Sequence, residues 1–112
     1  MFARNHDELT LDQLTDAERE EVFAAFCPSD DLKLFGRGLR MRLPTMLAGD
    51  ARRLRMAYSL VFSLPGAPVI FYGEEIGMGE NRDIPGREAV SSPMQWADAP
   101  NGGFFSAPAG QL

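Results

Sequence analysis

The sequence predicts an α/β fold that is rich in helix and contains one short strand of the parallel type. Two capped segments, 15–26 and 51–64, predict helices. Residues 69–72 (Val-Ile-Phe-Tyr) form an apolar run without polar alternation, which is typical of a strand covered on both faces. Pro65-Gly66 precedes this run and cannot continue a helix, so the helix, the turn and the strand follow one another as in an α/β unit.

The composition predicts one soluble domain. The chain has 112 residues and a formal net charge of −5, which excludes nucleic acid as the natural partner. No apolar run approaches the ~18 residues of a membrane span, and no signal peptide is visible. We therefore expect a cytoplasmic protein without a membrane partner. The single cysteine, Cys27, excludes an internal disulfide and is interpreted as a passive helix-end residue.

The first helix has a clear start and stop. Thr15 and Glu18 have the spacing of a capping box, and Pro28 ends the helix after Phe26. Its apolar side comprises Val22, Phe23 and Phe26.

The central part of the chain contains interrupted helical patterns. Leucines in 30–49 predict two short helical pieces, which Gly36, Gly38 and Pro44 interrupt. Asp50 then caps the clearest helix, 51–64, whose apolar residues recur at three- and four-residue spacing. They are Leu54, Ala57, Tyr58, Val61 and Phe62. Residues 73–112 are predicted to be mostly loop.

Charges are segregated along the chain. Acids predominate in residues 7–31 and bases in residues 33–55, and we expect the two blocks to face each other. A solvated charged surface is the default interpretation of both blocks, and a binding patch is the alternative.

Two carboxylates, Glu74 and Glu75, follow the predicted strand 69–72. In α/β sheets and barrels, ligands bind at the carboxyl ends of the strands. A ligand-binding rim and a solvated acidic turn are both open at this point.

Three stretches in a fixed order point to a family. They are Arg-Asn-His-Asp-Glu-Leu at 4–9, residues 65–78 (Pro-Gly-Ala-Pro-Val-Ile-Phe-Tyr-Gly-Glu-Glu-Ile-Gly-Met), and Pro-Met-Gln-Trp at 93–96 followed by Asn-Gly-Gly-Phe at 101–104. Together they resemble the α-amylase family of glycoside hydrolases and transglycosidases (glycoside hydrolase family 13), and within it the trehalose synthase group. The chain has Ser91-Ser92 where the family often has Arg-Thr, which removes a positive charge near the active-site rim.

The resemblance implies that the chain is a fragment of a (β/α)₈ TIM barrel. Residues 5–7 match the end of the seventh barrel strand, 51–64 match the seventh helix, and 69–72 match the eighth strand. Residues 1–112 are therefore expected to form a single partial domain that corresponds to the C-terminal quarter of the catalytic barrel.

The resemblance also implies a site. The family cleaves α-glucosidic bonds by a retaining double displacement with two carboxyl groups, and a third carboxylate stabilises the transition state. Asp7 matches that third carboxylate. Asn5, His6 and Glu8 match substrate-binding positions, and Glu75 matches a possible rim position.

In the family, the nucleophile and the acid/base lie well upstream of the Asn-His-Asp segment, whereas here only Met1 to Asn5 lie upstream of His6 and Asp7. The chain alone is therefore expected to be inactive toward α-glucosides such as maltose or trehalose, and we expect no metal site and no cofactor.

A second class of function is a non-catalytic interaction module built from barrel parts. Two parallel strands with helices leave sheet edges unpaired, and covering them requires a partner or a second copy. We therefore expect a homo-oligomer.

Overall fold

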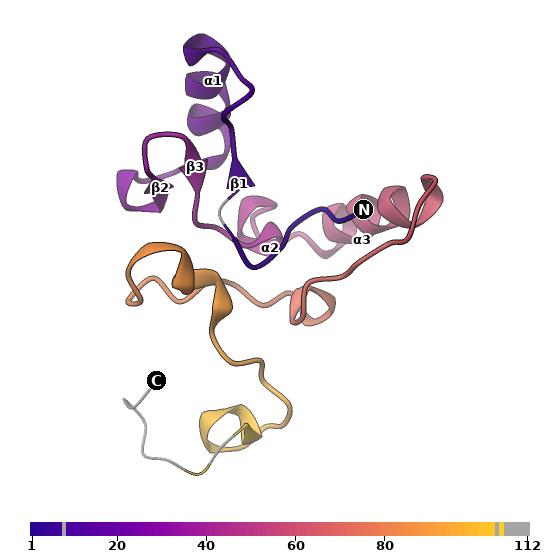
Figure 1. Cartoon of the computed structure of the whole chain (residues 1–112). Coiled ribbons are helices and arrows are strands. Elements are labelled where there is room, and N and C mark those ends of the chain that lie inside the picture. The colour runs from indigo at the N-terminus through magenta and orange to yellow at the C-terminus, as the bar shows by residue number, and fades with distance from the viewer. Residues whose placement is uncertain (8, 105, 107–112) are drawn as a thin grey trace.

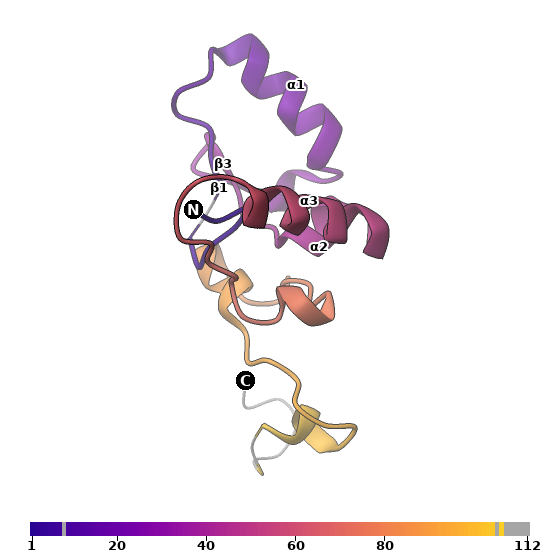
Figure 2. The same ribbon diagram turned by 90° about the vertical axis from the view of Figure 1, so that its right-hand side faces the viewer.

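The computed structural model describes residues 1–7, 9–104 and 106. It is elongated, with principal extents of 46 × 33 × 22 Å. Figure 1 shows helix α1 (Asp16–Phe26) at one end and the 3₁₀ helix η4 (Pro100–Gly103) at the other. Figure 2, turned by 90°, shows helix α3 (Ala51–Ser63) crossing between them beside the N-terminal segment.

The described residues form a small antiparallel sheet. Its strands are β1 (Leu9–Thr10), β2 (Lys33–Leu34) and β3 (Gly38–Leu39), in the order β1-β3-β2. Leu39 pairs with Leu9 on one side and with Lys33 on the other. The prediction of a parallel-type sheet is therefore wrong for the part of the chain that the structure describes.

The β2–β3 hairpin lies where the sequence predicts helical pieces. Phe35 and Gly36 both have positive φ, and the Arg37 amide donates to the Leu34 carbonyl at 3.2 Å. Positive φ at both central residues is the geometry of the tight turns that favour hairpins. Helical structure in this region is limited to the 3₁₀ helix η1 (Asp30–Leu32) and helix α2 (Leu43–Met46).

The predicted start of α1 is confirmed. The Thr15 side chain accepts a hydrogen bond from the Glu18 amide, and the Glu18 carboxylate accepts one from the Thr15 amide at 2.9 Å. Phe23 of α1 packs with Leu11 and Leu39 in the core cluster. The cap therefore positions the one buried apolar residue of α1 against the sheet.

Helix α3 begins at its predicted cap and ends one residue early. The Asp50 carboxylate accepts from the amides of Arg52 and Arg53, and the helix ends at Ser63. Of its apolar residues, Val61 is buried and Phe62 is exposed. Met56 and Leu60, four positions apart on the same side of the helix, are also exposed and form an uncovered apolar face of α3.

The predicted strand 69–72 is absent. Val69 and Ile70 are 53% and 43% exposed, and no ladder is assigned to them. Met1 alone pairs with this segment: its amino group donates to the Ala67 carbonyl at 2.7 Å and its carbonyl accepts from the Val69 amide at 2.8 Å. This is the bonding pattern of one parallel pair, but a buried parallel strand requires neighbours along its length.

The C-terminal part is mostly irregular, as predicted. It contains the 3₁₀ helices η2 (Glu74–Ile76), η3 (Gly86–Ser91) and η4. Among the described residues, ion pairs connect the two charge blocks. They join Lys33 to Asp30, Arg37 to Asp12, and Arg40 to Asp31.

In the described ranges, no helix combines the length and the apolar character needed to cross a membrane. The cytoplasmic location stays a prediction.

The stability of α1 depends on the Thr15 hydroxyl of the capping box. We expect Thr15→Ala to lower the free energy of unfolding by about 1 kcal/mol, because a helix amide loses its acceptor. Urea denaturation measures the change. Ser59→Ala, at an exposed interior position of α3, is the control and is expected to cause no loss. Equal destabilisation by both variants would contradict a role for the cap.

Candidate functional site

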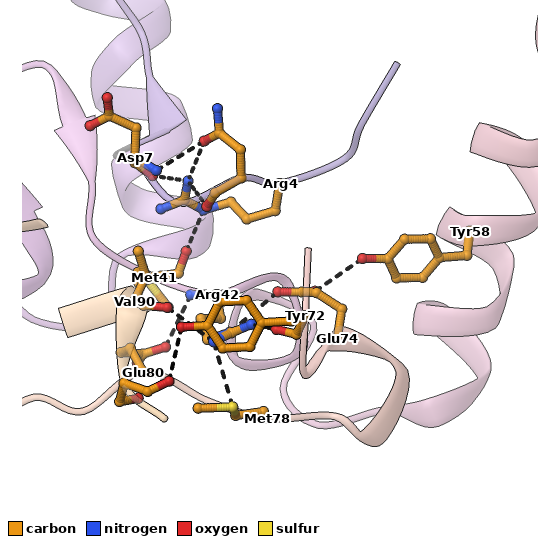
Figure 3. Close-up of polar contacts among 12 residues, drawn as sticks. Arg4, Asp7, Met41, Arg42, Tyr58, Tyr72, Glu74, Met78, Glu80 and Val90 are labelled. Carbon is orange, nitrogen blue, oxygen red and sulfur yellow. Dashed lines mark hydrogen bonds and ion pairs between the residues drawn. The ribbon is translucent and has the colours of Figure 1, made fainter. Parts of the chain in front are cut away.

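A buried arginine shapes the segment that carries the predicted site. Arg4 is 2% exposed, and its Nε donates to the Met41 carbonyl at 2.6 Å. Its Nη1 donates to the backbone carbonyls of Asn5 and Asp7. The Asp7 amide donates to Asn5 Oδ1 at 3.1 Å. These bonds fix the turn at 5–7 against the chain that follows β3 (Figure 3).

The Asp7 carboxylate is paired with a residue 80 positions away. Arg87 Nη1 lies 3.0 Å from Asp7 Oδ1 and 3.1 Å from Oδ2. Charge-assisted bonds of this kind are among the stronger hydrogen bonds in proteins. Because both side chains are partly exposed, the carboxylate remains accessible from solvent.

The other predicted site residues are placed differently. Asn5 uses its side-chain carbonyl within the turn, whereas His6 is exposed beside it. Glu75 lies in η2 and lines two separate cavities. Leu54 lines one of them and Tyr72 lines the other. The prediction for Glu8 lies outside the described residues.

A second buried arginine organises the C-terminal half. Arg42 is fully buried, and its guanidinium donates to the carbonyls of Tyr72 and Val90, the latter at 3.0 Å. Its centre lies 4.4 Å from the Phe71 ring centroid. Figure 3 shows this convergence, including the contact with Met78. Arg42 therefore joins the start of α2 to three later segments.

Arg42 is also one half of a buried ion pair. Its Nε lies 3.4 Å from Glu74 Oε1, without the alignment of a hydrogen bond. Tyr58 of α3 donates its hydroxyl to Glu74 Oε2 at 3.4 Å. Burial raises the pKa of Glu74, and the nearby guanidinium only partly opposes this rise. Burial, together with the Glu74 charge, raises the pKa of Tyr58 as well.

Position 73, next to the Arg42–Glu74 pair, requires glycine. Gly73 has φ +83°, and a Cβ there would lie 2.6 Å from Met78 Sδ and 3.3 Å from Arg42 Nη2. Only a residue without a side chain fits this approach.

Helix η3 links the two arginine centres. It contains Arg87, which bonds Asp7, and Val90, whose carbonyl accepts from Arg42. The end of the expected eighth strand, at Tyr72, is held by the same Arg42. The structure therefore connects Asp7 to the segment 69–72 through η3.

Sequence reasoning did not identify Arg4, Arg42 or Arg87 as functional or organising residues, and it considered Glu74 only as part of a ligand-binding rim or a solvated acidic turn. Arg4 and Glu74 lie within the motifs at 4–9 and 65–78, which was the available signal. Arg42 and Arg87 lie outside the three motifs and give no local signal.

A cavity of about 770 Å³ lies between η3 and the segment 78–84. Its lining includes Glu80, Asn81, Arg82, Asp83, Glu88 and Gln95. Carboxylate, amide and guanidinium groups can bond sugar hydroxyls as acceptors and donors. Among the described residues, no group of three or more His, Cys, Asp or Glu side chains could hold a metal ion.

Comparisons with known proteins identify the class. The chain is homologous along its whole length to enzymes of the α-amylase family, which confirms the resemblance of the three motifs. Two relatives that match nearly the whole chain are trehalose synthases. The chain is 42% identical over 112 residues to a trehalose synthase/amylase of Mycolicibacterium smegmatis, and 42% identical over 108 residues to a trehalose synthase of Thermus thermophilus.

The chain spans only a small part of these relatives, 19% of the first and 11% of the second. A mouse protein named as an amino acid transporter heavy chain is 46% identical over 57 residues, which cover 45% of this chain. No family model matches the sequence. Similarity over this segment therefore establishes homology but does not by itself establish an activity.

The raised pKa of Glu74 predicts a pH-dependent effect of Glu74→Gln. Between the ordinary glutamate pKa and the raised value, the folded state binds the proton more tightly than the unfolded state does. The stability contributed by neutral Glu74 is therefore present at low pH and lost as the pH rises. We expect the free energy of unfolding of the variant, relative to the wild type, to increase between about pH 4 and about pH 8.

Urea denaturation at both pH values measures this difference. The exposed neighbour Glu75→Gln is the control and should show no such trend. If the free energy of unfolding of Glu74→Gln, relative to the wild type, decreased over this pH range, Arg42 would hold the pKa of Glu74 below its ordinary value.

Proposed function

We propose that this chain is the part of an α-glucoside-acting enzyme, of the trehalose synthase type, that supplies the sugar-holding carboxylate Asp7. The observation that carries the proposal is the match to trehalose synthases along the full chain, with Asp7 held in a fixed turn. Maltose and trehalose are the proposed substrates of the complete enzyme. The chain alone is proposed to lack activity.

The proposed chemistry is a retaining double displacement. A nucleophile and an acid/base, supplied by other parts of the enzyme, break and reform the glucosidic bond. Asp7 and His6 are neighbours in the chain. In this proposal the carboxylate accepts from, and the imidazole donates to, adjacent sugar hydroxyls. Such bonds accelerate the reaction if they strengthen as the ring flattens toward the oxocarbenium-like transition state.

Arg87 supports this role by orienting Asp7. Its guanidinium lies 3.0 Å from the carboxylate and forms charge-assisted hydrogen bonds with it. A carboxylate has about four acceptor positions, so Asp7 can bond Arg87 and sugar hydroxyls together.

The barrel is proposed for the complete enzyme. The parallel pairing between Met1 and the segment at Ala67 and Val69 supports it, because neighbouring parallel strands pair in this way. In this proposal, the segment 69–72 becomes the eighth strand when the remaining strands flank it.

A second proposal is a self-associating module. Met56, Leu60 and Phe62 are exposed on α3, and Val69 and Ile70 are exposed nearby in the chain. Large exposed apolar patches mark interaction surfaces. A second copy that covers this face would give a homo-oligomer.

A chimera tests the enzymatic proposal. We expect that the matched segment of the Mycolicibacterium smegmatis enzyme can be replaced by this chain with retention of maltose–trehalose interconversion. In the chimera, Asp7→Asn should lower the turnover at least about 100-fold, because a preorganised charge at the reacting ring is lost. Turnover of both sugars is measured by chromatography.

Asp12→Asn serves as the matched control, because Asp12 is a partly exposed acid paired with Arg37 and is expected to leave turnover unchanged. Full activity of the Asp7→Asn chimera would contradict the proposed role of Asp7.

Light scattering tests self-association. If a second copy covers the apolar face of α3, the double variant Met56→Ser/Leu60→Ser should shift the chain toward monomer at tens of micromolar. Phe35→Ser, at an exposed position of the hairpin turn, should not. A wild-type chain that is monomeric with a cooperative melt would contradict the second proposal.

A further inference from the structure

We propose that the cavity between Tyr72, Trp96 and Phe104 binds one pyranose ring, with Glu75 accepting hydrogen bonds from its hydroxyls. The choice of a sugar rests on the proposed function. The cavity measures about 340 Å³ and is also lined by Ser91, Pro93 and Met94. This volume is at the lower end of the range of small-molecule sites, which suits a single sugar ring.

One wall of the cavity is held in a fixed orientation. The Tyr72 hydroxyl donates to the Ser92 carbonyl at 3.0 Å. The Arg42 guanidinium lies 5.1 Å from the Tyr72 ring centroid, and the Phe71 ring contacts it edge-on at 4.7 Å. A ring held on several sides loses little freedom when a ligand binds, which favours affinity.

The opposite wall is closed by a turn of the backbone. The Trp96 amide donates to the Gly102 carbonyl at 2.7 Å, which places Phe104, two residues further on, near Trp96. Gly102 has φ +61°, and a Cβ there would lie 2.9 Å from Gln95 Cγ. The turn therefore needs glycine, and it brings two aromatic side chains to one cavity.

The chemistry of the cavity matches a sugar better than a wholly apolar partner. Trp96 and Phe104 are 68% and 53% exposed. A pyranose has an apolar C–H face that packs on aromatic rings and hydroxyls that need acceptors. Glu75 and Ser91 provide polar groups, whereas an apolar occupant would desolvate the carboxylate without replacing its hydrogen bonds.

The cavity can be tested in the free chain because Trp96 is its only tryptophan. We expect titration with maltose to change the Trp96 fluorescence saturably, with a dissociation constant on the order of 1 mM. Phe104→Ala and Glu75→Gln should each weaken binding at least fivefold. Both positions are exposed, so both variants should remain folded. Phe62→Ala, an exposed aromatic on α3, is the matched control and should bind like the wild type.

Three results would overturn the proposal. They are no saturable change, the same change with glycerol, and a spectrum that depends on protein concentration alone, which would mean that a second copy fills the cavity. Sugar binding without an active chimera would count against the proposed function only, and an active chimera without sugar binding would count against the cavity only.

Discussion

The buried guanidinium of Arg42 is the interaction on which the C-terminal half depends. The residues that follow α3 form no ladder of their own in the described structure, so long-range contacts must hold them. Arg42 donates to the carbonyls of Tyr72 and Val90 and pairs with Glu74. The planar guanidinium suits this role because it carries five donors and can also stack on aromatic rings. Helix η3 then brings Arg87 to Asp7.

The sequence predicted the features that are encoded locally. The caps of α1 and α3 need only neighbouring residues, and both helices begin where Thr15 and Asp50 indicate. The segment 69–72 has high β propensity, but a strand requires partners that the described chain provides only at Met1. The β2–β3 hairpin was missed because Gly36 and Gly38 were interpreted as interruptions of helices rather than as turn residues.

The candidate site is predicted from the sequence only as far as its motif extends. The Asn-His-Asp segment predicts Asp7, and the structure adds the groups that contact it, Arg4 and Arg87. Arg87 lies 80 residues from Asp7, and no periodic pattern signals such a contact. The apolar face of α3 and the cavity at Trp96 are both exposed in a chain that spans 19% or less of its trehalose synthase relatives. Such exposed surfaces can contact either the rest of an enzyme or a ligand.

The most direct test of the central claim is a crystal structure of the chimera with an α-glucoside bound. If this chain supplies the sugar-holding carboxylate, the Asp7 oxygens will lie within hydrogen-bond reach, about 2.6–3.2 Å, of two sugar hydroxyls, and residues 69–71 will pair as a parallel strand. A bound sugar that contacts the two upstream carboxyl groups while Asp7 points away from it would contradict the account.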